Sequence, residues 1–403
     1  MPELLIDGVL LLGHVILCVA IVNRLHSTGF DFRAVKVLEF PVGLWLCLAP
    51  AAWWKWVGVA PLALLTDLAR DGVSGNLQLL AAGRMLWASY AGVCGLVALL
   101  AVGDWARRRC RRPPAALRSS EGRLLDVQQE LGRPLAGDRI GQWCARLPGN
   151  QLFHLEVTRK SLAVPGLPGR LDGLTIAHLS DLHFTGRIAC DYYRHQIELA
   201  NEFEADLAVV TGDILDNWSC REWLPETLGR LRAKFGVFFL LGNHDLRPGH
   251  PAELRRLLVD LGLVDVGNRV VRTKVRDQTL DIVGNELPWF GPAPQLEPLE
   301  QAAPSSFRIL LSHAPDQLPW AIRHRFPLML AGHTHGGQIV FPVLGPIVAP
   351  SRHGVRYAGG VYDVRGVVLH VSRGLSGEEP LRWNCPPELP LLTLVPKSTT
   401  ECP

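Results

Sequence analysis

Five short apolar runs in the second half of the chain constrain the fold most, because each ends at a cluster of Asp, Asn or His. The runs occupy residues 174–179, 207–211, 237–241, 309–311 and 328–330. Their length and their content of Val, Ile, Leu and Phe favour buried strands. Helical stretches are expected between them, at 192–204, 223–234, 252–261 and 317–325. This alternation predicts a layered α/β domain.

Three later segments predict strands that pair without intervening helices. They lie at residues 270–275, 279–283 and 367–371 and are rich in Val, Leu and Thr. Hairpin-like pairing of such strands does not fit an all-parallel sheet. We therefore expect a mixed sheet or two packed sheets.

The strand-end clusters carry side chains that bind metals. They read Ser-Asp-Leu-His, Gly-Asp-Ile-Leu-Asp, Gly-Asn-His-Asp, Leu-Ser-His-Ala-Pro and Gly-His-Thr-His-Gly-Gly-Gln, and they contain Asp181, His183, Asp213, Asn243, His244, His313, His333 and His335. Because the carboxyl ends of parallel strands gather at one rim, we expect these side chains to converge. One such residue alone is more often a helix cap or a hydrogen-bonded polar group, but five clusters at five strand ends favour a site.

The chemistry of these side chains predicts which metals the rim would bind. Mixed carboxylate, amide and imidazole ligands suit Mn, Fe or Zn. The clusters contain no cysteine, which argues against a structural zinc site. Seven candidate ligands favour two divalent ions over one.

The five motifs resemble those of the calcineurin-like metallophosphoesterases, in the order and spacing of that family. Gly-His-Thr-His-Gly-Gly-Gln, with the later Ser-Arg-Gly-Leu and Cys-Pro-Pro-Glu, is similar to the membrane-anchored bacterial branch. The resemblance covers residues 171–395. It implies two packed mixed sheets flanked by helices, and a metal-dependent hydrolase of phosphoric esters or pyrophosphates. In this family two cations stabilise the attacking and leaving oxygens of an in-line displacement at phosphorus.

The resemblance also implies a role for each motif residue. The first metal would be bound by Asp181, His183 and His335, the second by Asn243, His313 and His333, and Asp213 would bridge the two. His244 would contact the phosphate or protonate the leaving oxygen, and Asp245 would orient His244. For Asp216 we expect a helix cap or a supporting role rather than direct metal contact.

The first 106 residues are expected to form a transmembrane region of about three helices. Apolar runs lie at 4–22, 38–59 and 85–103, and the second is interrupted by Pro41, Pro50 and Lys55. A cleaved signal peptide is the alternative for the first run. That run lacks a basic start, however, and two more apolar runs come after it.

Charges around these runs predict the orientation in the inner or plasma membrane. Arg24, Arg33 and Lys36 mark the first loop as cytoplasmic, and the next loop, with Asp67, Arg70 and Asp71, is nearly neutral. The arginine block at 107–112 places the large domain on the cytoplasmic side. The nine scattered cysteines, with no Cys-x-x-Cys pair, fit a reducing compartment.

The remainder divides into a basic stop and linker at 107–150 and a metallophosphoesterase domain at 151–403. The linker is expected to contain a short amphipathic helix at 124–131. The uncharged run 339–350 is expected to form a buried strand and turn, with an acyl chain or bilayer contact as the alternative. Arg373 would either meet an anionic substrate or form an ion pair.

The family branch favours a phosphodiester or pyrophosphate of a lipid-linked substrate, such as a UDP-diacylglucosamine type of lipid A precursor. A soluble nucleotide phosphodiester is the alternative substrate, and a noncatalytic metal-binding membrane scaffold or sensor is the alternative function. We expect membrane lipids as partners and no nucleic acid. The net charge of +3 identifies no partner.

Overall fold

The computed structural model describes residues 2–57, 76–110, 113–296 and 306–397. It divides into two compact units, one made of residues 1–26 and 30–112 and the other of residues 27–29 and 113–403. The loop with Asp67, Arg70 and Asp71, the end of the arginine block at 111–112, and Cys402 lie outside the described residues. All eight cysteines that the structure describes are free thiols.

The described residues of the first unit contain three apolar helices. They are α1 (Pro2–His26), α2 (Phe32–Val57) and α4 (Asn76–Arg109). Each is long and apolar enough to cross a membrane, over Leu5–His26, Phe32–Ala52 and Met85–Arg109. The helix α2 continues through Pro41 and Pro50. The expected helical membrane region is therefore confirmed in length and composition.

A close approach and a small polar cluster join these helices. A Cβ atom on Gly13 would lie 1.8 Å from the carbonyl oxygen of Cys94, so only glycine allows α1 and α4 to pack this closely. The Tyr90 hydroxyl lies 2.6 Å from His14 Nδ1 and accepts a hydrogen bond from Trp45 Nε1 at 3.0 Å. One hydroxyl thus contacts side chains from both of the other helices.

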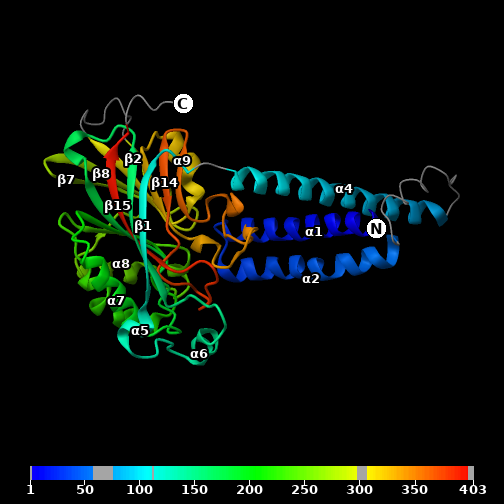
Figure 1. The fold of residues 1–403 in the computed structure, drawn as a ribbon, viewed down its shortest axis with the longest axis horizontal. Helices are drawn as coiled ribbons and strands as arrows, with labels where there is room; N and C mark the ends of the chain where they lie inside the picture. Colours follow the sequence, from blue (N-terminus) through cyan, green and yellow to red (C-terminus); the bar gives the residue numbers. More distant parts are fainter. Residues whose placement is uncertain (1, 58–75, 111–112, 297–305, 398–403) are drawn as a thin grey trace. The chain divides into compact units, whose positions relative to one another are not determined.

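The second unit is built on two mixed sheets (Figure 1). The first has the order β1-β2-β15-β3-β4-β5-β6, and its strands are β1 (Leu117–Asp126), β2 (His154–Val164), β3 (Leu174–Leu179), β4 (Leu207–Thr211), β5 (Val237–Leu240), β6 (Val264–Asp265) and β15 (Glu388–Pro396). The second has the order β13-β14-β10-β9-β8-β7, and its strands are β7 (Val270–Val275), β8 (Gln278–Asn285), β9 (Phe307–Ser312), β10 (Leu328–Ala331), β13 (Gly360–Val364) and β14 (Val367–Val371).

The strands that precede the polar clusters run parallel to their neighbours. In the first sheet β3, β4 and β5 are parallel, with Val210 opposite both Leu179 and Phe239. In the second sheet β9 and β10 are parallel, with Leu311 opposite Leu330. Strands in such register end at the same edge, so the segments that leave them share one rim.

Alternating side chains divide the core into layers. Ile176 of β3 faces the second sheet and belongs to the same apolar cluster as Ile309 and Val368, whereas its neighbour Ala177 faces the opposite way. Two helices, α7 (Cys190–Asn201) and α8 (Pro251–Asp260), cover the outer face of the first sheet, and α9 (Leu318–Arg323) covers that of the second (Figure 1). The expected fold of two packed mixed sheets flanked by helices is confirmed.

Part of the segment expected as a linker belongs to the first sheet. The strand β1 pairs antiparallel with β2 along its length, and the helix α5 covers only Val127–Leu131. A second short helix, α6, covers Arg139–Ala145. The expected helix at 124–131 is therefore wrong over its first three residues. The edge strand β1 is largely exposed and polar, so it lacks the apolar alternation that marks a half-buried strand.

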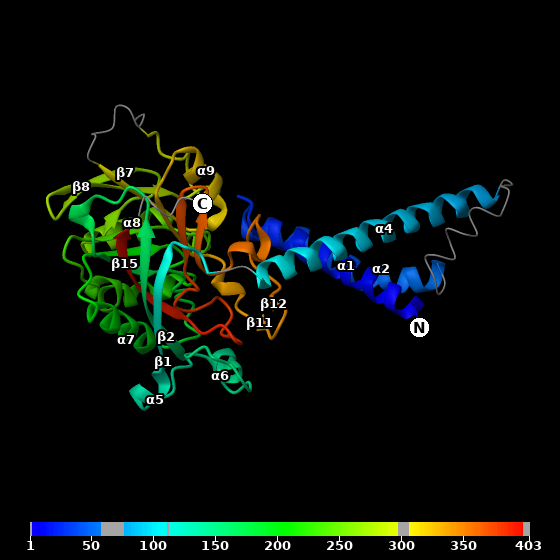
Figure 2. The same ribbon diagram turned by 45° about the horizontal axis from the view of Figure 1, so that its top comes forward.

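Two further expectations about local structure are wrong. The helix expected at 223–234 is replaced by the 3₁₀ segments Trp218–Glu226 and Leu228–Arg230, because Pro225 cannot donate the hydrogen bond of an α-helix. The run 339–350 forms the two-stranded hairpin β11 (Val340–Phe341) and β12 (Gly345–Pro346), which is exposed rather than buried. The hairpin forms its own small sheet, separate from the two large ones (Figure 2).

Candidate metal centre

The polar clusters at the ends of five strands meet at one rim of the second unit. They form three groups whose possible ligand atoms lie within 4.8 Å of one another: a first and a second group that both include Asp213, and a third group of His183, Asp216 and His244. The first group contains Asp181, His183, Asp213 and His335, and the second contains Asp213, His313 and His333. Because Asp213 belongs to both groups, it occupies the position of a shared ligand.

The first group is held by short contacts between its imidazoles and carboxylates. His183 Nε2 lies 3.1 Å from His335 Nε2 and 3.6 Å from Asp213 Oδ2. His335 Nε2 in turn lies 3.4 Å from Asp181 Oδ1. Asp181, His183 and Asp213 are fully buried, so these polar atoms face one another and not water.

The second group is centred on His313. Its Nε2 atom lies 3.1 Å from each of three atoms, namely Asn243 Oδ1, His333 Nδ1 and Asp213 Oδ2. The amide oxygen of Asn243 thus adds a fourth potential ligand atom to this group. The seven strand-end residues therefore come together in space as two groups that share Asp213.

The contacts in both groups fit bound cations. Two imidazole nitrogens that face each other at 3.1 Å cannot both be acceptors in a satisfied hydrogen bond. Bonds of about 2.0–2.1 Å to one tetrahedral Zn²⁺ would place two such nitrogens roughly 3.3 Å apart. The observed spacing is close to that value, and the mixed N and O donors suit Mn, Fe or Zn.

One carboxylate oxygen points to the same conclusion. Asp213 Oδ2 is buried and has no hydrogen bond from any described residue. It lies 3.1, 3.6 and 3.9 Å from the Nε2 atoms of His313, His183 and His244, but none of these contacts has hydrogen-bond geometry. Buried polar atoms normally have a partner, and a shared cation would supply it.

Hydrogen bonds behind the rim fix the orientation of two imidazoles. His183 Nδ1 lies 2.9 Å from Asp216 Oδ2, and His313 Nδ1 lies 2.7 Å from the carbonyl oxygen of Thr211. A carbonyl or an ionised carboxylate can only accept, so both Nδ1 atoms carry the proton. The Nε2 atoms of both rings then face the two groups, and each can ligate a metal once its proton is lost.

Charges in the rim shift several pKa values. Burial disfavours the imidazolium of His183, but the Asp216 carboxylate overcomes it and raises the pKa of His183 to about 9. Asp213 likewise overcomes burial and raises the pKa of His313 to about 9. The pKa of Asp213 itself is well below its usual range, because His313 and His244 outweigh burial. Cation binding would therefore release protons from these imidazoles.

The backbone of the rim adopts conformations that side chains normally avoid. Five candidate ligands have positive φ values, namely Asp181 (54°), His183 (51°), Asp213 (54°), His333 (71°) and His335 (52°). Each such conformation costs on the order of 1–3 kcal/mol and is found mainly at functional sites. Five such residues at one rim indicate that this backbone conformation is kept because it directs the candidate ligand side chains toward the site, and not because it is locally stable.

Glycines beside the ligands are required by close packing. A Cβ atom on Gly242 would lie 2.2 Å from Asp213 Oδ1, and one on Gly332 would lie 2.4 Å from Asp181 Oδ2. Any larger residue would displace these carboxylates from the rim. The Gly-Asn and Gly-His pairs in the sequence thus have a steric cause.

The carboxylate that contacts the His244 ring is Asp216 and not Asp245, which corrects the expected pairing. Asp216 Oδ1 lies 2.5 Å from His244 Nδ1. Asp245 instead accepts hydrogen bonds from the backbone N–H groups of Ile214, Leu215 and Gly242 at 2.8–2.9 Å. Asp245 therefore holds two rim loops together, and Asp216 joins His183 to His244. The expected supporting role of Asp216 agrees with this geometry, whereas Asn217 supplies the cap of the next helical segment.

Two charged residues at the rim carry no signal in the sequence. Glu378 Oε2 lies 3.7 Å from His244 Nε2, and Glu378 Oε1 accepts a hydrogen bond from Arg247 Nη1 at 2.5 Å. Both come from loops outside the five motifs. Arg247 follows His244 by three residues, but the proximity of Glu378 to His244 follows only from the folded chain, so sequence spacing could not reveal it.

A buried polar chain lies behind His313. Lys160 Nζ, which only donates, lies 2.5 Å from Glu388 Oε1 and 3.2 Å from His370 Nε2. His370 Nε2 therefore accepts, and its Nδ1–H donates to His178 Nδ1 at 2.9 Å. His178 Nε2–H then donates to the hydroxyl of Thr211, again at 2.9 Å. Burial lowers the pKa of His178 to about 3, which keeps it neutral.

Arg373 belongs to the same buried chain. It pairs with Glu388, with its Nε atom 3.3 Å from Oε2, and with Glu156. Of the two roles expected for Arg373, the structure therefore supports the ion pair. His178 and His370 join the two sheets, and the chain ends at Thr211, whose carbonyl oxygen holds His313.

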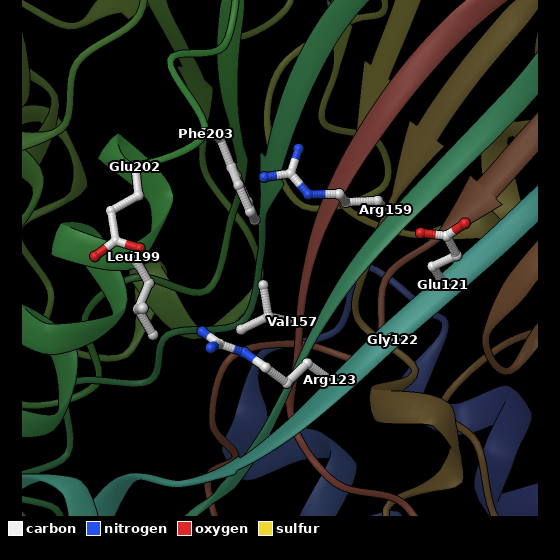
Figure 3. Close-up of a pocket in the computed structure, with 8 residues that line it drawn as sticks. All are labelled: Glu121, Gly122, Arg123, Val157, Arg159, Leu199, Glu202 and Phe203. Carbon is white, nitrogen blue, oxygen red and sulfur yellow. The ribbon is translucent and has the colours of Figure 1, made fainter.

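The second unit also contains a cavity of about 340 Å³, and Figure 3 shows the residues that line it. It is lined by β1, β2 and the end of α7, including Arg123, Arg159 and Phe203. Its lining on β1 and β2 lies at one edge of the first sheet, where β15 and β3 separate β2 from β4. The residues lining this cavity include none of the candidate ligands.

Comparison with known proteins points to one family. The family model described as calcineurin-like phosphoesterase matches residues 174–337. The chain is 31% identical over 250 residues to the uncharacterized metallophosphoesterase YkuE of Bacillus subtilis, a match that covers 61% of this chain and 86% of that protein.

Two further relatives differ in how much of them is matched. The phosphodiesterase YaeI of Escherichia coli is 29% identical over 224 residues, covering 55% of this chain and 82% of that protein. A transmembrane protein with metallophosphoesterase domain from Bos taurus is 32% identical over 206 residues, covering 46% of each chain.

Proposed function

We propose, for a chain that belongs to the calcineurin-like metallophosphoesterase family and is therefore a metal-dependent phosphoester hydrolase, that it cleaves a phosphodiester or pyrophosphate of a lipid-linked substrate. Three apolar helices associate this chain with a membrane. A membrane-associated enzyme meets lipid substrates at high effective concentration. A UDP-diacylglucosamine type of lipid A precursor is the most concrete candidate.

Two divalent cations, of Mn, Fe or Zn, are proposed as cofactors. One ion would be held by Asp181, His183 and His335, and the other by Asn243, His313 and His333. Asp213 would contact both ions. When bound, the ions would polarise the phosphoryl group and stabilise charge on the attacking and leaving oxygens. The observation that carries this proposal is the position of Asp213 Oδ2 among three imidazoles without a hydrogen bond from the described residues.

His244 is proposed as the acid that protonates the leaving oxygen. Its Nδ1 atom is engaged by Asp216, so Nε2 is the ring atom left to face the rim, 3.9 Å from Asp213 Oδ2. Asp216 also holds His183, and thus fixes a ligand and the proposed acid together. In the imidazolium form, His244 Nε2–H would transfer its proton to the departing oxygen.

The substrate proposal is tested by turnover of the purified, metal-loaded full chain on three substrate classes. These are lipid phosphodiesters, lipid pyrophosphates and a soluble nucleotide phosphodiester. Turnover of each is measured for the wild type and, as a control, for Asp213→Asn. Faster turnover of a lipid substrate supports the proposal, whereas faster turnover of the nucleotide favours the alternative substrate. Metal binding without turnover of any phosphoester would favour the scaffold or sensor.

The second unit is proposed to lie in the cytoplasm, as a domain that comes after the membrane region. This placement rests on Arg107, Arg108 and Arg109 in the last turn of α4. Cys110 is exposed and directly follows these arginines, whereas Cys220 is buried. A membrane-impermeant maleimide should therefore label Cys110 only after the cells are opened. Labelling of Cys110 in intact cells would reverse the proposed orientation.

A further inference from the structure

The hairpin β11–β12 exposes apolar side chains directly after the last ligand motif. Residues 339–350 contain no charged residue. Five of its apolar side chains are well exposed, namely Phe341 (38%), Val343 (63%), Leu344 (57%), Ile347 (38%) and Val348 (50%). Contiguous apolar exposure on a soluble domain marks a surface that contacts another apolar phase.

The base of the hairpin is pinned to the metal rim. Val340 N–H donates to the carbonyl oxygen of Trp383 at 2.9 Å, and Trp383 N–H donates to that of Gln338 at 3.0 Å. The preceding residue, Arg382, donates from Nη1 to the carbonyl oxygen of His335 at 2.9 Å. The base of the hairpin therefore has a fixed connection to a candidate metal ligand.

The apolar side chain at the turn of the hairpin stabilises neither the turn nor the folded domain. Val343 has a φ of 69°, a conformation that suits glycine or asparagine and is unfavourable for a β-branched residue. Its side chain is exposed, so it gains little apolar burial in return. An apolar residue at a position where a polar turn residue would be more stable indicates a contact outside the domain.

We propose that this hairpin inserts into the interface of the lipid bilayer. The same chain carries three candidate membrane spans, and only residues 110–112 separate the end of α4 from the second unit at Pro113. A tether this short keeps the domain at the membrane surface, which raises the effective concentration of bilayer around the hairpin.

The residues around the hairpin match the chemistry of a bilayer interface. Trp383 is 39% exposed and contacts Phe341 edge to face, with 5.8 Å between ring centroids. Aromatic side chains favour the headgroup level. Arg352 and Arg356, which come after the apolar run, are exposed and complement anionic headgroups. The apolar side chains of the hairpin, the aromatic Trp383 at its base and the flanking arginines thus match the acyl chains, the headgroup level and the anionic surface of a bilayer.

Insertion of the hairpin would also bring a lipid phosphate to the metal rim, an inference that rests on the proposed function. A phosphate at the headgroup level would then meet the metal rim while its acyl chains remain in the bilayer. Insertion itself requires no turnover, so it is tested without an activity measurement.

The test uses the full chain reconstituted in vesicles of phosphatidylcholine and phosphatidylglycerol. A Leu344→Cys variant, in a background with Cys47→Ser and Cys110→Ser, carries an environment-sensitive fluorophore. The matched control is Val259→Cys on α8, an apolar residue of the same unit that is 48% exposed. Lipids with a nitroxide on the acyl chain serve as the quencher. If Leu344→Cys does not fold, Ile347→Cys replaces it.

Insertion predicts emission at shorter wavelength and strong quenching by the lipid nitroxide for the Leu344 position, with neither effect at Val259. Equal emission and quenching at the two positions would overturn the proposal. A shift to shorter wavelength without nitroxide quenching would also overturn it, because a protein partner or a second copy of the chain would then cover the hairpin. Either outcome is independent of whether the chain hydrolyses a lipid substrate.

Discussion

The metal rim and the β11–β12 hairpin depart from the usual pattern of burial in opposite directions, although Val340 follows His335 by only five residues. The rim buries carboxylates and imidazoles, with Asp181, His183 and Asp213 fully inaccessible to water. The hairpin exposes apolar side chains such as Val343 and Leu344. Buried charges and exposed apolar surface both cost stability unless something outside the polypeptide compensates. We propose that cations compensate the first region and that lipid compensates the second.

Replacing the shared ligand tests the rim most strongly. Asp213→Asn removes the negative charge common to both groups, so we expect kcat to fall by about 10⁴-fold or more, with loss of bound metal. Asp316→Asn is the matched control, because Asp316 is also buried but bonds Ser351. Measured with a generic phosphodiester, similar losses in the two variants would mean that burial of an aspartate, and not ligation, explains the effect.

Removing the proposed acid should have the next largest effect. His244→Ala is expected to lower kcat by about 10³-fold while leaving the metal content unchanged, because His244 is not assigned to either ion. His195→Ala, at a surface contact with Glu130, should leave both quantities unchanged. Loss of metal from His244→Ala would show instead that His244 is a ligand.

The buried chain behind the rim predicts a pH-dependent stability. Glu388 is buried, but Lys160 and Arg373 overcome the effect of burial and hold its pKa below 4.5. Its carboxylate therefore stabilises the fold above about pH 4.5, and this contribution is lost as the pH falls further. Near pH 7, Glu388→Gln should lower the free energy of unfolding by about 3 kcal/mol, because Lys160 is left buried without its carboxylate.

Thermal unfolding of the full chain at several pH values checks this prediction. The difference between wild type and Glu388→Gln should be full near neutral pH and should narrow in acid. The control is Glu379→Gln, which removes an exposed partner of Arg187 and should change stability by less than about 1 kcal/mol. A difference that stays constant with pH would contradict the ionised state of Glu388.

The hairpin should show the smallest effect on stability. Leu344→Ser is expected to change the free energy of unfolding by less than about 0.5 kcal/mol, because its side chain is already exposed. Leu330→Ala, in the core between the sheets, should cost about 2–5 kcal/mol. Chemical denaturation of both variants in detergent measures the contrast. A large loss for Leu344→Ser would mean that the hairpin supports the fold and is not kept for an outside contact.

Local patterns in the sequence were enough to predict the layers of the fold and the convergence of the rim residues. Short apolar runs ending in Asp, Asn or His combine strand periodicity with the geometry of parallel sheets, and both act over a few residues. The partner of His244 was not predictable in this way. Asp245 is adjacent in sequence, but the turn after β4 brings Asp216 to the imidazole and directs Asp245 to backbone amides.

The exposure of the hairpin and the long-range ion pairs also depend on information beyond the local sequence pattern. The run at 339–350 has the composition of a core strand, and only its position outside both large sheets exposes it. Lys160 meets Glu388 across 228 residues, where spacing in the sequence carries no signal. Such contacts arise from tertiary packing, which periodicity alone does not encode.

The metal content of the purified full chain, measured after loading with manganese and removal of free ions, tests the central claim most directly. We predict two ions per chain for the wild type and a clear loss for Asp213→Asn, with Asp316→Asn unchanged. A wild-type chain that retains no ion or a single ion under saturating manganese, iron and zinc would contradict the two groups joined by Asp213.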